Sequence, residues 1–218
     1  MNLNTSDTSR RVAIQKMLLA ISGFSFMPSM LMAENQASTL PPSFTNDGLK
    51  PFLVPPSAPL EPGKVGLNIR TLVRSSQTNL QFSSVEFAVA AKKMGPAPHL
   101  HKELDELMFV VEGTASVMVE DTVYEIPAGG WHLRPRNMSH TFFNNTNQPF
   151  RAIDMYFNQN FEDYLEELYY KIIPDMIAQK ASMRDPAIAK RMDALHAKFG
   201  ITEFPKQREL IIKKYGLW

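Results

Sequence analysis

The sequence predicts an all-β core with α-helices packed outside it. Residues 65–157 consist of short runs rich in Val, Ile, Thr, Phe and Tyr, separated by Gly, Pro and Asn at intervals suited to antiparallel strands. After Asn160 the apolar residues recur at a helical spacing instead, which predicts amphipathic helices. No internal repeat is visible, and 218 residues are enough for one domain with extensions.

Residues 1–33 have the layout of an export signal. Arg10 and Arg11 precede a mostly apolar stretch that runs from about Met17 to Met32, and small Ala33 offers a cleavage point. The paired arginines resemble a twin-arginine signal, although that family usually places a large apolar residue where Ala13 stands. We therefore expect a periplasmic or otherwise exported protein.

A membrane anchor is the alternative for this segment. Its apolar part is shorter than the roughly 20 residues that a span needs, and Gly23 and Pro28 interrupt it. A cleaved signal is favoured, with no membrane association after cleavage.

Residues 34–63 are predicted to form a proline-rich arm. Prolines occur at 41, 42, 51, 55, 56, 59 and 62, and each fixes φ and removes a backbone donor. The arm should be extended or irregular. It can cross to a second copy to form a homodimer, or the C-terminal helices can cover the protein's own sheet instead.

Residues 64–158 should form the β-barrel. Its clearest predicted strands are Ser84–Ala90, Glu106–Val111, Ala115–Val119, Trp131–Arg134 and Phe150–Phe157.

Residues 159–218 are predicted to form a C-terminal helical extension. Two apolar helix faces are visible, one formed by Phe161, Leu165, Leu168 and Ile172 and the other by Ile188, Met192, Leu195 and Phe199. Asp185 can cap the second helix, Pro186 suits its first turn, and Gly200 can end it in a left-handed conformation. Residues 206–216 predict a shorter third helix.

Composition restricts the chemistry and the partners. The formal net charge is +1 and no run of five or six like charges occurs, so nucleic acid is not an expected partner and a small-molecule substrate is. Cysteine is absent, which leaves histidine and carboxylate as the expected metal ligands.

Four of the five histidines fall between positions 99 and 140. In a strand, residues i and i+2 point to the same face, so His99 and His101 present two imidazoles side by side. A hairpin can return the carboxylate of Glu106 to these rings, while His140 must come from a separate strand. The clustering predicts a metal site.

These residues carry a family resemblance. His99 to Gly113 reads His-x-His-x4-Glu-x6-Gly, which resembles the first motif of the cupin superfamily. The second motif follows as Gly-x5-Pro-x-Asn-x2-His-x3-Asn over residues 129–144, with Asn137 in place of a usual glycine. Asparagine tolerates positive φ, so this turn should form.

The chain is thus similar to single-domain (type-2) cupins, in particular to quercetin-dioxygenase-like members. The resemblance implies a double-stranded β-helix (jelly-roll) barrel with one divalent metal ion held by His99, His101, Glu106 and His140. Iron or manganese is favoured, and nickel, copper or zinc would also accept these ligands.

His132 and His196 lie outside the two motifs' ligand positions. In Trp131–Arg134, we expect the apolar residues to face the barrel, which places His132 and Arg134 on the surface. In the opposite orientation, His132 and Arg134 would line the cavity as a base and an anion clamp. His196 is predicted to be a solvated helix residue without a functional role.

Three functions remain open from the sequence. A metal-dependent dioxygenase acting on a small aromatic or enolic substrate is the first, with Glu106 as a catalytic proton acceptor. The second is a non-redox metalloenzyme, an isomerase or decarboxylase. The third is a non-catalytic protein that binds a metal or a small ligand.

Overall fold

The computed structural model describes residues 48–218. The predicted export signal, and the predicted arm as far as residue 47, lie outside the described residues. From Gly48 to Gly63 the chain contains neither helix nor strand, as the prolines predicted. The arm is fixed near its end, where the guanidinium of Arg70 donates a hydrogen bond of 3.0 Å to the carbonyl of Ala58.

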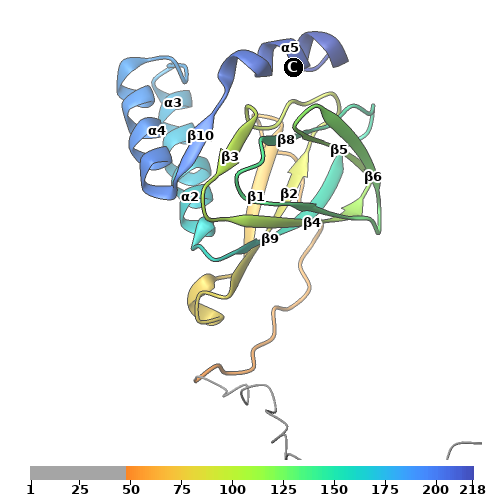
Figure 1. The fold of residues 1–218 in the computed structure, drawn as a ribbon, viewed down its shortest axis with the longest axis vertical. Helices are drawn as coiled ribbons and strands as arrows, with labels where there is room; N and C mark the ends of the chain where they lie inside the picture. The colour runs from red at the N-terminus through yellow and green to blue at the C-terminus, as the bar shows by residue number, and fades with distance from the viewer. Residues whose placement is uncertain (1–47) are drawn as a thin grey trace, which may run out of the picture. The chain divides into compact units, whose positions relative to one another are not determined.

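Two antiparallel five-stranded sheets form the β core (Figure 1). One sheet has the strand order β1-β2-β9-β4-β7 and the other has the order β10-β3-β8-β5-β6. The strands are β1 Leu67–Val73, β2 Phe82–Val89, β3 His99–His101, β4 Asp105–Glu112, β5 Thr114–Val119, β6 Thr122–Pro127, β7 Trp131–Arg134, β8 His140–Phe143, β9 Phe150–Phe157 and β10 Ile201–Glu203. The predicted all-β jelly-roll class is confirmed.

Alternation along the strands determines what faces the interior. In β9, burial alternates strictly, and Phe150, Ala152, Asp154 and Tyr156 are the buried residues. β9 lies between β2 and β4 in its sheet, so its inward positions are covered from both sides. Two of these inward residues, Asp154 and Tyr156, carry polar groups, and both line the cavity at the candidate site.

The predicted orientation of β7 is wrong. Trp131 and Leu133 are 55% and 54% exposed, whereas Arg134 is 1% exposed and His132 is half-buried. The reason is the register with β4, in which Arg134 lies opposite the buried Glu106. An ion pair inside the barrel therefore determines which face of β7 points inward, against the apolar character of the other face.

The helices follow the barrel, apart from a short 3₁₀ turn, η1 (Ser75–Gln77), between β1 and β2. They are α2 Phe161–Glu167, the π-helical turn η2 Leu168–Ile172, α3 Ile173–Ala178, α4 Pro186–Phe199 and α5 Pro205–Tyr215. The first predicted helical stretch is thus an α-helix interrupted by a π turn rather than one regular helix.

The predicted first residue and end of α4 are confirmed, but the predicted cap at Asp185 is wrong. Pro186 starts the helix and Gly200 ends it with φ of 65°. The carboxylate of Asp185 does not cap the helix amides, because it accepts a hydrogen bond from the backbone N–H of Ser182 instead. The helix start therefore relies on Pro186.

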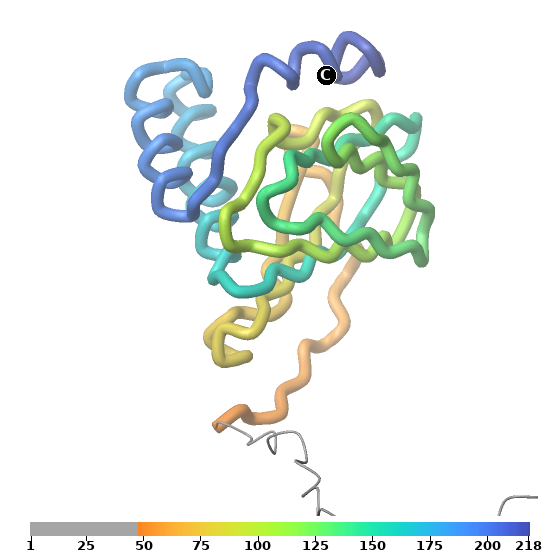
Figure 2. The backbone as a smooth tube through the Cα atoms, viewed as in Figure 1, coloured from red at the N-terminus to blue at the C-terminus, as the bar shows by residue number. Residues whose placement is uncertain are grey.

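The helical extension and the barrel share one hydrophobic core. Phe161, Ile188 and Phe199 belong to the same buried cluster as Val85 and Met108 of the strands. Figure 2 shows α5 passing over one end of the barrel after β10 has run alongside β3. The extension is therefore part of the folded unit.

The C-terminus is tied to the barrel by Trp218. Its backbone N–H donates to the carbonyl of Lys92, its carbonyl accepts from the N–H of Met94, and its indole N–H donates to the carbonyl of Ala91. These bonds hold the end of α5 in place. Among residues 48–218, no helix is long and apolar enough to cross a membrane.

Two glycines with positive φ offer a matched test of the barrel turns. Gly113 has φ of 76° and a Cβ placed there would lie 2.7 Å from the carbonyl oxygen of Pro149. Gly129 has φ of 85° but nothing lies within 4 Å of such a Cβ. We expect Gly129→Ala to cost about 1–2 kcal/mol, from backbone strain alone. Gly113→Ala should cost about 1–3 kcal/mol more because of the clash. Equal losses in chemical denaturation would contradict this account.

Candidate metal centre

The four predicted ligands converge inside the barrel from three strands. β3 supplies His99 and His101, β8 supplies His140, and β4 of the opposite sheet supplies Glu106. His99 and His140 lie directly opposite each other in the β3–β8 ladder. One ligand atom from each of the four residues can be chosen so that all lie within 4.8 Å of one another.

The predicted hairpin between the histidines and Glu106 is wrong. β3 and β4 follow one another in the sequence but belong to different sheets. The carboxylate of Glu106 therefore faces the imidazoles across the barrel interior rather than beside them in one sheet. Such an arrangement surrounds an ion from two sides.

Backbone carbonyls orient two of the imidazoles. Nδ1 of His99 lies 2.9 Å from the carbonyl oxygen of Ala97, and Nδ1 of His140 lies 3.0 Å from that of Met138. A hydrogen bond donated by Nδ1 leaves Nε2 as the nitrogen with the free lone pair. Both rings are thus fixed in the tautomer that a metal ligand needs.

The donor set fits a divalent transition metal. Nε2 of His101 lies 2.9 Å from Oε1 of Glu106, and Nε2 of His140 lies 3.5 Å from Oε2. Neither nitrogen has a hydrogen-bonding partner, although both are buried. Adjacent ligands of an octahedral ion with bonds of about 2.1 Å are themselves about 3 Å apart. Buried lone pairs at this spacing are the arrangement that a shared cation stabilises.

Burial and neighbouring groups shift the pKa values of two of the ligands, His99 and Glu106. Burial and the neighbouring imidazoles of His140 and His101 hold the pKa of His99 well below its usual value, so its ring is neutral. Burial opposes ionisation of Glu106, but Arg134 and His140 outweigh it and hold the pKa of this carboxyl well below its usual range. Glu106 is consequently a carboxylate.

A buried ion cluster positions Glu106. Nη2 of Arg134 lies 3.0 Å from Oε2 of Glu106 and 2.6 Å from Oδ1 of Asp154. The hydroxyl of Tyr156 donates a hydrogen bond of 3.3 Å to Oδ2 of Asp154. Burial raises the pKa of Asp154, although Arg134 opposes this. Arg134 thus lines the cavity, as in the alternative orientation of β7, but it pairs with two carboxylates of the protein, and His132 is not among the residues that line the cavity.

The sequence analysis did not identify Asp154 as a site residue, although its position in an apolar strand could have indicated it. An aspartate at an inward position of the apolar strand β9 needs a buried partner, and Arg134 is that partner.

One cavity of about 80 Å³ adjoins the candidate ligands. His99, Glu106, Arg134 and Asp154 form its polar end, and apolar side chains form most of its wall. The cavity opens beside the exposed Glu203, and its size suits a small ligand such as a single-ring acid.

The prediction for His196 is wrong. Rather than lying in solvent, it is partly buried and lines this cavity, with Nε2 3.2 Å from the hydroxyl of Tyr164. The contact joins α4 to α2, and the single-helix pattern around His196 gave no sign of it.

Comparison with known proteins finds a family model that matches most of the barrel. Residues 85–156 match the family model described as Cupin domain. The barrel has the cupin fold. The match covers β2 to β9 and includes all four candidate ligands, while the helical extension lies outside it.

Individual relatives are more distant. A germin-like protein, 9-2, of Oryza sativa subsp. japonica is 30% identical over 118 residues, or 52% of this chain. The chain spans 55% of the length of that curated relative. Among solved structures, KdgF from Halomonas sp. is 17% identical with a TM-score of 0.40, over 45% of this chain and 84% of that chain. The polyketide cyclase RemF from Streptomyces resistomycificus is 26% identical with a TM-score of 0.39, over 45% of this chain and 70% of that chain.

The folding stability of the barrel should decrease at acid pH because of His132. Burial, together with the charge of Arg134, lowers the pKa of His132 to about 4. Between pH 6.5 and 4 the unfolded chain therefore binds a proton that the folded chain does not, and stability falls as the pH falls. The ring is only half-buried, so we expect about 1 kcal/mol at pH 5 after allowing for solvent screening, or about 2–4 °C in melting temperature.

His132→Gln should remove that part of the acid sensitivity. Melting of the metal-free protein at pH 7 and pH 5 tests this, with Trp131→Phe as a control in the same strand that should keep the wild-type difference. If His132→Gln loses as many degrees between the two pH values as the wild type, His132 is not the group responsible.

Proposed function

We propose that the protein is a metal-dependent dioxygenase acting on a small aromatic or enolic substrate. The observation that carries the proposal is the mainly apolar cavity lined by His99 and Glu106, two members of the cluster of three imidazoles and one carboxylate. The motif resemblance to quercetin-dioxygenase-like cupins favours the same reaction class, and the cavity volume favours a single-ring substrate over a larger one.

His99, His101, Glu106 and His140 would hold the metal, with iron or manganese favoured. When bound, such an ion would supply a redox-active Lewis acid. The side chains around it determine which substrates reach it.

Charge selects the substrate group that faces the ligands. The net charge at the metal end would be +1. A divalent ion and the guanidinium of Arg134 contribute three positive charges, and the carboxylates of Glu106 and Asp154 contribute two negative charges. An enolate, phenolate or carboxylate oxygen is therefore favoured at this end of the cavity.

The apolar wall complements the ring of an aromatic substrate. Phe142 and Phe161 line the cavity, and Phe161 packs edge-on to His101 with ring centroids 4.9 Å apart. Such a wall keeps water away from the reacting atoms and strengthens the charged interactions beside it.

Glu106 retains its proposed second role as a proton acceptor. The low pKa of Glu106 makes this carboxylate a weak base. It would therefore accept a proton only from a substrate hydroxyl whose own pKa is lowered when the substrate binds. Glu106→Gln should consequently reduce turnover more than it reduces metal content.

A non-redox isomerase or decarboxylase is the second candidate. It is favoured by the buried carboxyl of Asp154 on the cavity wall, whose raised pKa suits it to carry a proton. Such an enzyme would convert its substrate equally well without oxygen.

Oxygen uptake by the metal-loaded protein distinguishes these candidates. Reconstituted with Fe(II) or Mn(II) and offered a panel of single-ring phenols and enols, the wild type should consume oxygen in proportion to substrate. His140→Ala should be inactive, while the exposed-site control Glu209→Gln should match the wild type. Substrate conversion without oxygen uptake would replace the dioxygenase with the non-redox enzyme, and binding without any conversion would leave a ligand-binding protein.

A further inference from the structure

The cavity has a second polar end, built by the helical extension. Tyr164 of α2, His196 of α4 and Glu203 of β10 line the same cavity as His99 and Glu106. All three lie outside residues 85–156, the part that matches the cupin model. The extension therefore supplies side chains to the cavity that the barrel alone does not have.

Tyr164 and His196 form a hydrogen-bonded pair. The hydroxyl of Tyr164 lies 3.2 Å from Nε2 of His196, and the two rings are nearly parallel, at 19°. Burial raises the pKa of Tyr164, so its hydroxyl stays protonated. When this hydroxyl donates to Nε2, its oxygen can still accept a hydrogen bond from a ligand.

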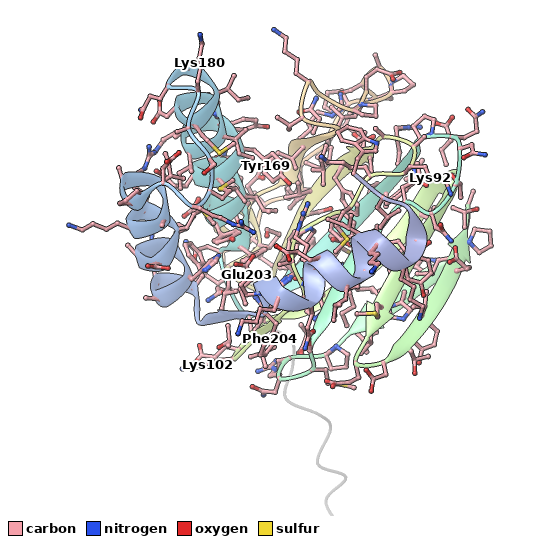
Figure 3. All side chains as sticks on the ribbon, turned by 90° about the horizontal axis from the view of Figure 1, so that it is seen from above. Lys92, Lys102, Tyr169, Lys180, Glu203 and Phe204 are labelled. Carbon is pink, nitrogen blue, oxygen red and sulfur yellow. The ribbon has the colours of Figure 1, made fainter. Side chains whose placement is uncertain are left out.

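Strand pairing places Glu203 beside the candidate metal ligands. β10 pairs with β3 so that Glu203 lies opposite His99 and Ile201 lies opposite His101. Directly opposed residues of an antiparallel pair have side chains on the same face of the sheet. Figure 3 looks onto this end and shows Glu203 next to the start of α5, on the side where the helices cover the barrel.

The carboxylate of Glu203 makes no direct polar contact within the described part of the chain. Within residues 48–218 no salt bridge or side-chain hydrogen bond engages it, and the residue is exposed at the cavity mouth. Glu203 and the guanidinium of Arg208 attract each other at longer range, but the carboxylate oxygens keep their hydrogen-bonding capacity for a ligand.

Apolar side chains separate Tyr164 from the candidate metal ligands, whereas Glu203 lies on the strand next to His99. Phe161 stacks on Tyr164 with a centroid distance of 4.8 Å and an angle of 9°, and it also packs edge-on to His101. Leu165 and Leu168 of the same helical stretch continue the wall. A ligand that reaches both ends must therefore have a flat or apolar middle.

We propose that Glu203, Tyr164 and His196 form a recognition site for a hydroxyl or amino group on an aromatic acid whose oxyanion faces the metal. The two ends have opposite preferences: the metal end has excess positive charge and attracts an oxyanion, whereas Glu203 and the phenol oxygen accept hydrogen bonds. The inference rests on the metal site of the proposed function but not on its oxygen chemistry.

Calorimetric titration of the metal-loaded full chain tests the site with benzoate, 3-hydroxybenzoate, 4-hydroxybenzoate and 4-aminobenzoate as probes. We expect at least one substituted acid to bind about tenfold more tightly than benzoate, the gain typical of a hydrogen bond to a charged group. Glu203→Gln and His196→Phe should reduce that preference to about twofold or less. Glu209→Gln, the same change at a surface glutamate outside the cavity, should keep the full preference.

Metal content and melting temperature of each variant show whether it is folded and loaded. Equal affinity of the wild type for all four probes, absence of binding, or a preference that survives both Glu203→Gln and His196→Phe would overturn the inference. The preference should persist even if no oxygen is consumed, so failure of the dioxygenase and failure of this site give different results.

Discussion

The structure depends on a guanidinium buried between two carboxylates. Arg134 is 1% exposed and bridges Glu106 of β4 and Asp154 of β9, so three strands of one sheet meet at a single charge cluster. Removing one partner from such a cluster typically costs about 3–5 kcal/mol, because a charge is left buried and unpaired. The cluster also keeps Glu106 ionised and aimed at the imidazoles, which joins the stability of the barrel to its chemistry.

Much of the fold was predictable because it follows from local pattern. Period-two alternation gave Phe150–Phe157 without error, and Pro186 with Gly200 gave the bounds of α4. The ligand spacing was equally visible, since two imidazoles at i and i+2 must share a face. The four side chains do come together, and their binding of a metal remains a prediction.

Features that depend on long-range pairing were not predictable. Alternation in β7 defines two faces but does not say which one points inward. The two deciding partners of Arg134 are remote in sequence: Glu106 lies 28 residues before it and Asp154 lies 20 residues after it. His196 was missed because its neighbour Tyr164 lies on another helix, 32 residues away in sequence. A single sequence records neither contact.

The central claim is that His99, His101, Glu106 and His140 bind one divalent metal ion. Elemental analysis of the protein, purified from its native compartment without added metal, tests this most directly beside a His99→Ala/His101→Ala double variant. The account predicts about one equivalent of a transition metal in the wild type and a large loss in the variant. Equally low metal in both proteins would contradict it and would leave the barrel as a metal-free binding domain.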